Sequence, residues 1–151
     1  MAVLSADSTQ ALEHRGDPKI RELIAGVTDI FYKGGLCYWA SGGGITPVAA
    51  SGLEFAGICM EGVSATNAVT RIKVATGGEW LLLYSGTPAL TDEGTLLSVD
   101  VSAASDNPAD LLLHSAGATG DFGIGVITEF VSAARGAWVN IERNTLATVH
   151  A

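Results

Sequence analysis

The chain has 151 residues, of which 48% are hydrophobic and only 16% are charged, and its formal net charge is −8. This length suits a single domain with one core. The acidic balance excludes a nucleic-acid-binding face, because phosphate binding requires a basic patch and the eight Lys and Arg residues are scattered along the chain.

The scarcity of charge indicates that other molecules cover part of the surface. A typical globular chain has about 25% charged residues, whereas 16% is too few to cover a bare monomer. We therefore expect a homo-oligomer, with a trimer as the expected form. The start of the chain lacks the basic and apolar regions of a signal peptide, and no apolar run approaches the ~18 residues of a membrane span, so a soluble protein made in the cytoplasm is expected.

The first 28 residues are interpreted as an N-terminal arm with a short helix. Met1 to Gly16 are small and polar without a sustained period, which is typical of a segment that orders only on a surface. Asp17 can then serve as the N-cap of a helix that stops at Gly26. The apolar face of this predicted helix consists of three residues, Ile20, Leu23 and Ile24.

From Asp29 the pattern changes to short strands, which predict a single β domain over residues 29–143, followed by a tail at 144–151. The two halves of this domain span residues 30–84 and 92–142, and the link Ser85–Asp92 joins them. Gly77–Gly78 predicts a two-residue hairpin within the first half. The predicted strands are Ile30–Tyr32, Leu36–Ala40, Thr46–Ala50, Phe55–Gly62, Arg71–Val74, Glu79–Tyr84, Leu96–Val101, Leu111–Leu113, Phe122–Val131 and Ala137–Ile141.

An internal repeat relates the two halves. The stretch Gly57–Ala65 returns 68 positions later (125 − 57) as Gly125–Ala133, with Gly, Glu, Val, Ser and Ala at matching positions. Upstream, Lys33–Trp39 has a counterpart in Asp92–Val99, again a glycine turn leading into a β-rich run. Two copies are too few for a solenoid. The sequence therefore predicts an all-β fold, a small antiparallel β-sandwich or barrel with a pseudo-two-fold repeat, an extended N-terminal arm and one short helix.

No arrangement of residues favours catalysis, a metal or a cofactor. The three histidines, His14, His114 and His150, are too far apart in sequence to suggest a shared metal. Cys37 and Cys59 lie in strand-like apolar runs and are expected to be buried, with their pairing left open. The equivalence of Glu61 and Glu129 follows from the repeat itself. Arg15–Gly16–Asp17 matches the integrin-recognition tripeptide, but so short a match arises easily by chance.

Contact with other proteins is the remaining role, and large apolar residues are the candidates for it. All three tryptophans fall in predicted strands. If Val139 and Ile141 face the core, alternation turns Trp138 outward, where it would anchor a contact. The interface candidates are Leu4, Ile20, Leu23, Trp39, Trp80 and Trp138.

A series of segments in the first half resembles the phage capsid decoration proteins, also called head cement proteins. The series consists of Ile30–Cys37, Gly44–Val48, Phe55–Glu61 and an alternating strand. A second series resembles the closing half of the same pattern and consists of Asp92–Leu97, Gly123–Ile127 and Ala137–Ile141. The resemblance implies a small β-sandwich or barrel without catalysis. It also implies a structural virion protein on the outer capsid surface, whose partners are the major capsid protein and other copies of itself, with an N-terminal arm gripping neighbouring subunits.

Two other classes of function stay open. A small β-rich module for carbohydrate or peptide would use outward aromatics as its platform. A swinging-arm carrier also has two related β halves, but it needs a modifiable lysine at a hairpin tip, and neither Lys33 nor Lys73 has that setting.

Overall fold

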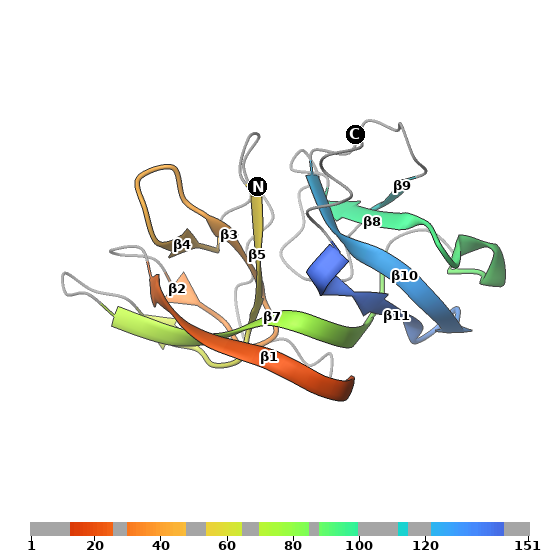
Figure 1. Cartoon of the computed structure of the whole chain (residues 1–151), viewed down its shortest axis with the longest axis horizontal. Coiled ribbons are helices and arrows are strands. Elements are labelled where there is room, and N and C mark those ends of the chain that lie inside the picture. The colour runs from red at the N-terminus through yellow and green to blue at the C-terminus, as the bar shows by residue number, and fades with distance from the viewer. Residues whose placement is uncertain are drawn as a thin grey trace.

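The computed structural model describes residues 13–25, 30–47, 54–64, 70–84, 88–99, 112–114 and 122–143, and in these residues the protein is all-β, as predicted (Figure 1). Two single turns of 3-10 helix, η1 (Leu90–Asp92) and η3 (Ile141–Arg143), accompany the strands. The strands are β1 (His14–Ala25), β2 (Ile30–Phe31), β3 (Leu36–Trp39), β4 (Ile45–Thr46), β5 (Glu54–Cys59), β6 (Val63–Ser64), β7 (Thr70–Leu82), β8 (Leu96–Val99), β9 (Leu112–His114), β10 (Phe122–Ser132) and β11 (Gly136–Asn140).

Strand pairing closes part of the main sheet into a ring. The nine strands follow the order β1-β4-β3-β5-β7-β11-β10-β8-β9, and β1 also pairs with β7. The strands β1, β4, β3, β5 and β7 therefore form a five-stranded barrel, from which β11, β10, β8 and β9 extend as a second layer (Figure 1). All of these pairs are antiparallel except β1 with β4. A separate small sheet joins β2 to β6.

The described residues have two hydrophobic cores rather than the single one expected from chain length. One core fills the barrel and the other lies between the barrel wall and the second layer. Neighbouring residues of one strand enter different cores: Ile58 and Cys59 do so in β5, and Val74 and Ala75 do so in β7. Successive strand residues point to opposite faces, so β5 from Phe55 to Cys59 and β7 around Val74 and Ala75 are buried on both sides, whereas Arg71 and Lys73 at the start of β7 are exposed. This two-sided burial places much of the apolar excess inside the chain.

The predicted helix at residues 17–26 is wrong, because His14–Ala25 form the long strand β1. Leu23 and Ala25 are buried whereas Glu22 and Ile24 are exposed, which is the period of two of a strand. Pairing with β7 from His14 to Ala25 stabilises the strand conformation over the helix. Pro18 lies between Arg15 and Lys19, where the register shifts, so its missing N–H interrupts no regular ladder.

The predicted hairpin at Gly77–Gly78 is also wrong, because β7 runs through it without a break for 13 residues. A Cβ on Gly77 would lie 2.5 Å from Cγ of Glu142, and Gly78 has a φ of +100° beside Pro18. Glycine in a strand often marks a close approach of another segment. The glycine pair therefore lets η3 and β1 pack closely on β7 instead of turning the chain.

Strand register recurs between the two halves. The β3–β5 pairing matches the β8–β10 pairing residue for residue, with one residue skipped in each longer strand. The glycine two residues before each first strand, β3 or β8, donates an equivalent hydrogen bond to the second strand. Gly34 N–H donates to the Cys59 oxygen at 2.8 Å, and Gly94 N–H donates to the Ile127 oxygen at 2.7 Å. The matched pairs are Leu36–Ile58 with Leu96–Val126, Cys37–Gly57 with Leu97–Gly125, Tyr38–Phe55 with Ser98–Gly123, and Trp39–Glu54 with Val99–Phe122.

This recurrence is local. β5 ends at Cys59, whereas β10 continues to Ser132. The superposition of the two whole halves therefore stays a prediction.

Candidate functional site: a candidate interaction surface

The structure separates the interface candidates into exposed and buried side chains. Ile20 and Trp39 are each 42% exposed, so both are available for contact. Leu23 and Trp80 are 8% and 1% exposed, so the prediction that they are surface contacts is corrected. Leu23 points into the barrel, and Trp80 points into the second core. Leu4 lies outside the described residues. Further exposed apolar side chains belong to Ile24, Ile30 and Leu90.

Trp138 is half-buried and faces away from the core, because its neighbour Val139 and the following Ile141 are fully buried. Its ring is already covered within the chain, since the guanidinium of Arg15 lies over it at 4.9 Å from the centroid. A stacked cation of this kind attracts the ring face. Trp138 therefore already has a partner within its own chain.

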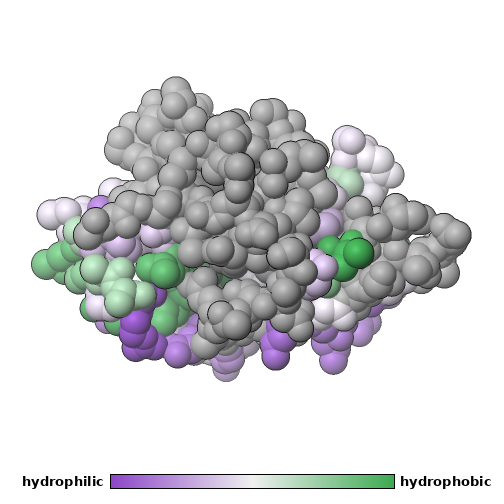
Figure 2. All heavy atoms as spheres, turned by 180° about the vertical axis from the view of Figure 1, so that it is seen from behind, coloured by the Kyte–Doolittle hydropathy of each residue, from purple (hydrophilic) through white to green (hydrophobic). Residues whose placement is uncertain are grey.

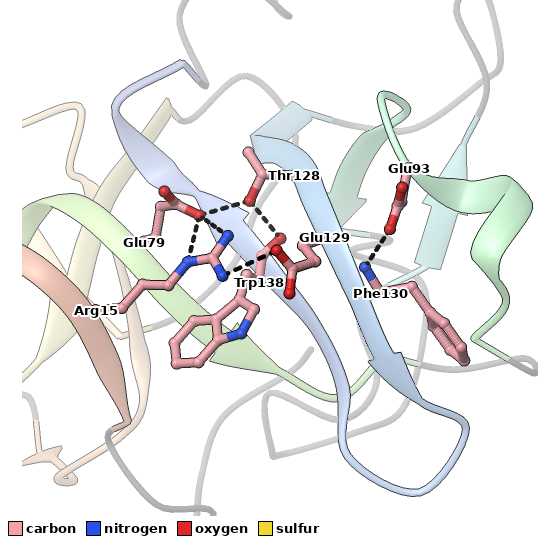
Figure 3. A network of polar contacts seen from close by, with 7 residues as sticks. All are labelled: Arg15, Glu79, Glu93, Thr128, Glu129, Phe130 and Trp138. Carbon is pink, nitrogen blue, oxygen red and sulfur yellow. Dashed lines mark hydrogen bonds and ion pairs between the residues drawn. The ribbon is translucent and has the colours of Figure 1, made fainter.

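Arg15 is the centre of a polar network that joins four strands (Figure 3). Its Nε and Nη2 both donate to Oε2 of Glu79 on β7, at 3.0 and 2.7 Å. Its Nη1 donates to Oε2 of Glu129 on β10 at 3.2 Å. We call this group, with Trp138 of β11 and Thr128 of β10, the Arg15 clasp. It fastens the start of β1 to the second layer.

The clasp shifts the ionisation of its members. The pKa of Glu79 is lowered, first by the Thr128 hydroxyl, which donates to it at 2.6 Å, and then by Arg15. The pKa of Arg15 is raised, mainly by its hydrogen bond to Glu79. Both directions favour the charged pair. The clasp is thus held by charge as well as by stacking.

A second set of contacts holds the beginning of the described chain. The Glu13 carbonyl accepts a hydrogen bond from Leu81 N–H at 3.0 Å. The Glu13 carboxylate pairs with Arg135, in the turn between β10 and β11, at 2.6 Å. Residues 13 to 15 therefore form a fixed base on the β domain for whatever precedes them.

These contacts change the interpretation of two sequence motifs. Arg15 of the Arg15–Gly16–Asp17 tripeptide is engaged in the clasp, so the tripeptide is not displayed as a free loop. Glu61 and Glu129 do not act as a carboxylate pair: Glu61 accepts from the Lys73 backbone N–H at 2.9 Å, whereas Glu129 binds Arg15. Sequence gave no sign of the clasp, because Arg15 is 64 and 114 residues away from its two carboxylates.

The two cysteines are free thiols buried in the barrel core. Cys37 Sγ donates to the Gly57 oxygen at 3.3 Å. Burial, together with the neighbouring Cys59, raises the pKa of Cys37 well above its ordinary value. A thiol in this state is inert, and so Cys37 has a packing role.

The described residues hold neither a metal-binding cluster nor a membrane-spanning helix. In the described ranges, no group of three or more His, Cys, Asp or Glu side chains is placed to hold a metal ion. His14 packs at a tilt against Trp80, 5.1 Å between ring centroids, while the side chain of His114 and all of His150 lie outside the described part. Among the described residues, no helix has the length and apolar character needed to cross a membrane.

Comparison with protein-family models, curated proteins and solved structures finds no match for this chain.

Proposed function

We propose that the protein is a structural virion protein that binds the outer surface of a phage capsid and stabilises it by bridging major capsid protein subunits. The resemblance of the residues to head cement proteins motivates the proposal. Its structural support is an all-β domain with exposed apolar side chains and a fixed base for the N-terminal segment. The protein acts in this proposal as a homo-oligomer without catalysis or cofactor.

The fixed base at residues 13–15 is the observation that carries the proposal. A segment that grips a capsid subunit transmits force only if its other end is held. Here the backbone of Glu13 bonds to β7, its carboxylate bonds to Arg135, and Arg15 bonds to two strands. Tension on residues 1–12 would therefore pass into β7, β10 and β11 together rather than peel a single strand.

Gripping by several linked copies would make weak contacts sufficient. Residues 1–12 contain a single charged side chain, Asp7, and mostly small residues. Ordering such a segment costs about 1–2 kcal/mol per residue, which a partner surface must offset. Linked copies on one shell raise the effective concentration of each further contact, so avidity would exceed single-site affinity by about 10²–10⁴.

The test is to delete residues 2–12 and compare heat resistance of phage heads. Heads assembled from the major capsid protein of the same genome are heated with full-length protein, with the truncated protein, or with neither. Deletion must stop before Glu13, because His14 and Arg15 pair with Trp80 and Glu79 of β7. We expect protection from full-length protein only. Equal survival of bare and decorated heads refutes cementing, and equal protection by both proteins refutes the role of the segment.

Trp39 supports a second candidate, a carbohydrate- or peptide-binding module. It is 42% exposed on β3, whereas Trp80 is buried and Trp138 carries Arg15. A single open aromatic face is a usual stacking platform for a sugar ring. Titration with glycans, followed by tryptophan fluorescence of the wild type and of Trp39→Ala, tests it. A saturable change lost in Trp39→Ala supports binding, and no change in either protein contradicts it.

A further inference from the structure

The first part of β1 is attached to the domain differently from the second part. The last six residues of the strand, 20–25, pair with β7 residue for residue, and Leu23 and Ala25 enter the barrel core. Upstream of them the register with β7 shifts twice, and none of residues 13–19 is buried. A regular ladder and a core therefore hold the second part only. We call residues 13–19 the strap.

Ion pairs hold the strap in place of a core. Four ion pairs form between described residues, and each has one partner in the strap. Their other partners lie on β7, on β10, in the turn between β10 and β11, and on η3. Apart from β7, none of these elements pairs with β1 in the described sheet, so side chains alone join them to the strap. The four pairs are Glu13–Arg135, Arg15–Glu79, Arg15–Glu129 and Lys19–Glu142.

Solvent reaches all four ion pairs. Side-chain exposure in them ranges from 31% for Glu79 to 69% for Lys19. Dissolved ions screen charges at such sites, and the screening distance falls from about 10 Å at 0.1 M salt to about 3 Å at 1 M. Residues 20–25 depend instead on backbone bonds and apolar packing, which have no net charge to screen. Salt therefore weakens the attachment of the strap selectively.

The strap covers two indole rings. The guanidinium of Arg15 lies over Trp138 at 4.9 Å from the ring centroid (Figure 3). His14 packs against Trp80 with 5.1 Å between the ring centroids. In Figure 1 β1 lies along the lower side of the molecule, and Figure 2 shows hydrophilic residues gathered along that edge. The closed strap thus places polar side chains over aromatic ones.

We propose that the strap is a salt-sensitive latch, which opens as a unit while the rest of the β domain stays folded and thereby uncovers Trp138. Segments with few buried contacts open at a lower free energy than the whole domain. The strap has this character, because its attachments are exposed ion pairs and a short, irregular ladder. Opening also removes the fixed base at residues 13–15. Its effect on capsid attachment rests on the proposed function, whereas the opening itself does not.

Amide hydrogen exchange of the full-length protein, followed by ¹⁵N NMR at about 0.1 M and about 1 M sodium chloride, measures the opening. The probe is the Leu81 N–H, which donates to the Glu13 oxygen at 3.0 Å and is freed when the strap opens. We expect the probe to exchange at least about tenfold faster at the higher salt concentration, while the amides of residues 20–25 keep their rates. An unchanged rate for the probe, or equal acceleration of the probe and of residues 20–25, would overturn the inference.

Breaking one ion pair tests whether the strap opens as a unit. Glu142→Gln removes the partner of Lys19 at one end of the strap, whereas the probe amide reports on the other end. We expect the probe to exchange about two- to fivefold faster at about 0.1 M salt. Glu22→Gln is the matched control, because it removes one carboxylate from the ladder part of β1 that forms no ion pair with a described residue.

The control should exchange like the wild type, and equal rates in the two variants refute opening as a unit. Circular dichroism checks that both variants fold. If Glu142→Gln does not fold, the salt comparison on the wild type still decides the inference.

Failure of this inference and failure of the proposed function are distinguishable. A strap that stays closed at about 1 M salt, on a protein that protects heads, refutes the latch and leaves capsid binding standing. A strap that opens on a protein that never binds heads supports the latch and refutes capsid binding.

Discussion

Substituting the two repeated glycines by alanine tests whether the repeat reflects the same packing in both halves. Gly57 on β5 and Gly125 on β10 occupy matched positions, opposite Cys37 of β3 and Leu97 of β8. A Cβ at Gly57 would meet the Ala75 carbonyl oxygen and Val74 Cγ1. A Cβ at Gly125 would meet the Asn140 oxygen and Val139 Cγ1 in the same way. The colliding residues belong to the strand paired on the other side, β7 for Gly57 and β11 for Gly125.

The distances set the expected magnitude. At Gly125 the new Cβ would be 2.6 Å from the Asn140 oxygen and 2.8 Å from Val139 Cγ1, so these atoms must move by 0.8 and 0.6 Å to reach the ordinary 3.4 Å. Overpacking of a core typically costs about 1–3 kcal/mol. Alanine also restricts the unfolded chain, which raises the free energy of unfolding by about 0.4–1 kcal/mol. We expect a net loss of about 1–2 kcal/mol for Gly125→Ala and a larger loss for Gly57→Ala, where the approach is closer.

Urea denaturation followed by circular dichroism measures these changes as free energies of unfolding. A loss of 1 kcal/mol corresponds to about 2–4 °C in Tm for a chain of this size. Gly42→Ala is the matched control, because its Cβ would have no neighbour within 4 Å and should leave stability unchanged or slightly raised. If Gly57→Ala and Gly125→Ala unfold like Gly42→Ala, the shared packing of the two halves is refuted.

Three further predictions concern the clasp and the thiols. Arg15→Ala should lower the free energy of unfolding by about 1 kcal/mol. Arg15→Lys should restore only part of the lost stability, because lysine keeps the charge but lacks the guanidinium fork that binds Glu79. Equal stability of all three proteins contradicts the clasp. Because the folded-state pKa of Glu79 is lowered, its contribution is fully present above the unfolded value of 4.5 and is lost as pH falls through the folded value. Urea denaturation should therefore show Glu79→Gln less stable than wild type at pH 7 and a smaller difference as pH falls below 4.5, and a constant difference would be inconsistent with this. A thiol reagent at pH 8 should leave Cys37 unmodified in the folded protein and modify it after unfolding, as judged by mass spectrometry, and rapid native labelling would contradict its burial.

The strands that could be predicted from sequence are those whose own residues specify them. β3, β5, β10 and β11 are apolar runs with glycine turns at their ends, and they occur within three residues of their predicted bounds. The repeat also indicated which strands correspond, and their local register does recur. Such features depend on neighbours in sequence, and for that reason sequence alone specified them.

The errors arose where distant segments decide the local structure. Ile20, Leu23 and Ile24 have the spacing of a helix face, but pairing of β1 with β7 imposes a strand. Gly77–Gly78 resembles a hairpin turn, but Glu142 and Pro18 pack against it. The partners in each case are more than 45 residues away along the chain. Propensity is a weak guide when tertiary contacts of this kind compete with it.

The candidate surface could be predicted only in part, because burial depends on how the two layers pack. Trp39 is exposed and Trp80 is buried, although both lie in predicted strands. The difference follows from packing: Trp80 lies in the core between the barrel wall and the second layer, whereas Trp39 belongs to neither core. Two-sided burial also accounts for apolar residues that composition alone assigned to an external contact. The homo-oligomer, expected from the low fraction of charged residues, stays a prediction.

Electron microscopy of assembled phage heads mixed with the purified protein tests the central claim most directly. Heads built from the major capsid protein of the same genome are imaged with and without the full-length chain. The account predicts additional density on the outer surface, of a size that fits this β domain, lying across the boundary between neighbouring capsid subunits. Heads that bind no protein, or density confined to the interior or to a single subunit, would contradict it.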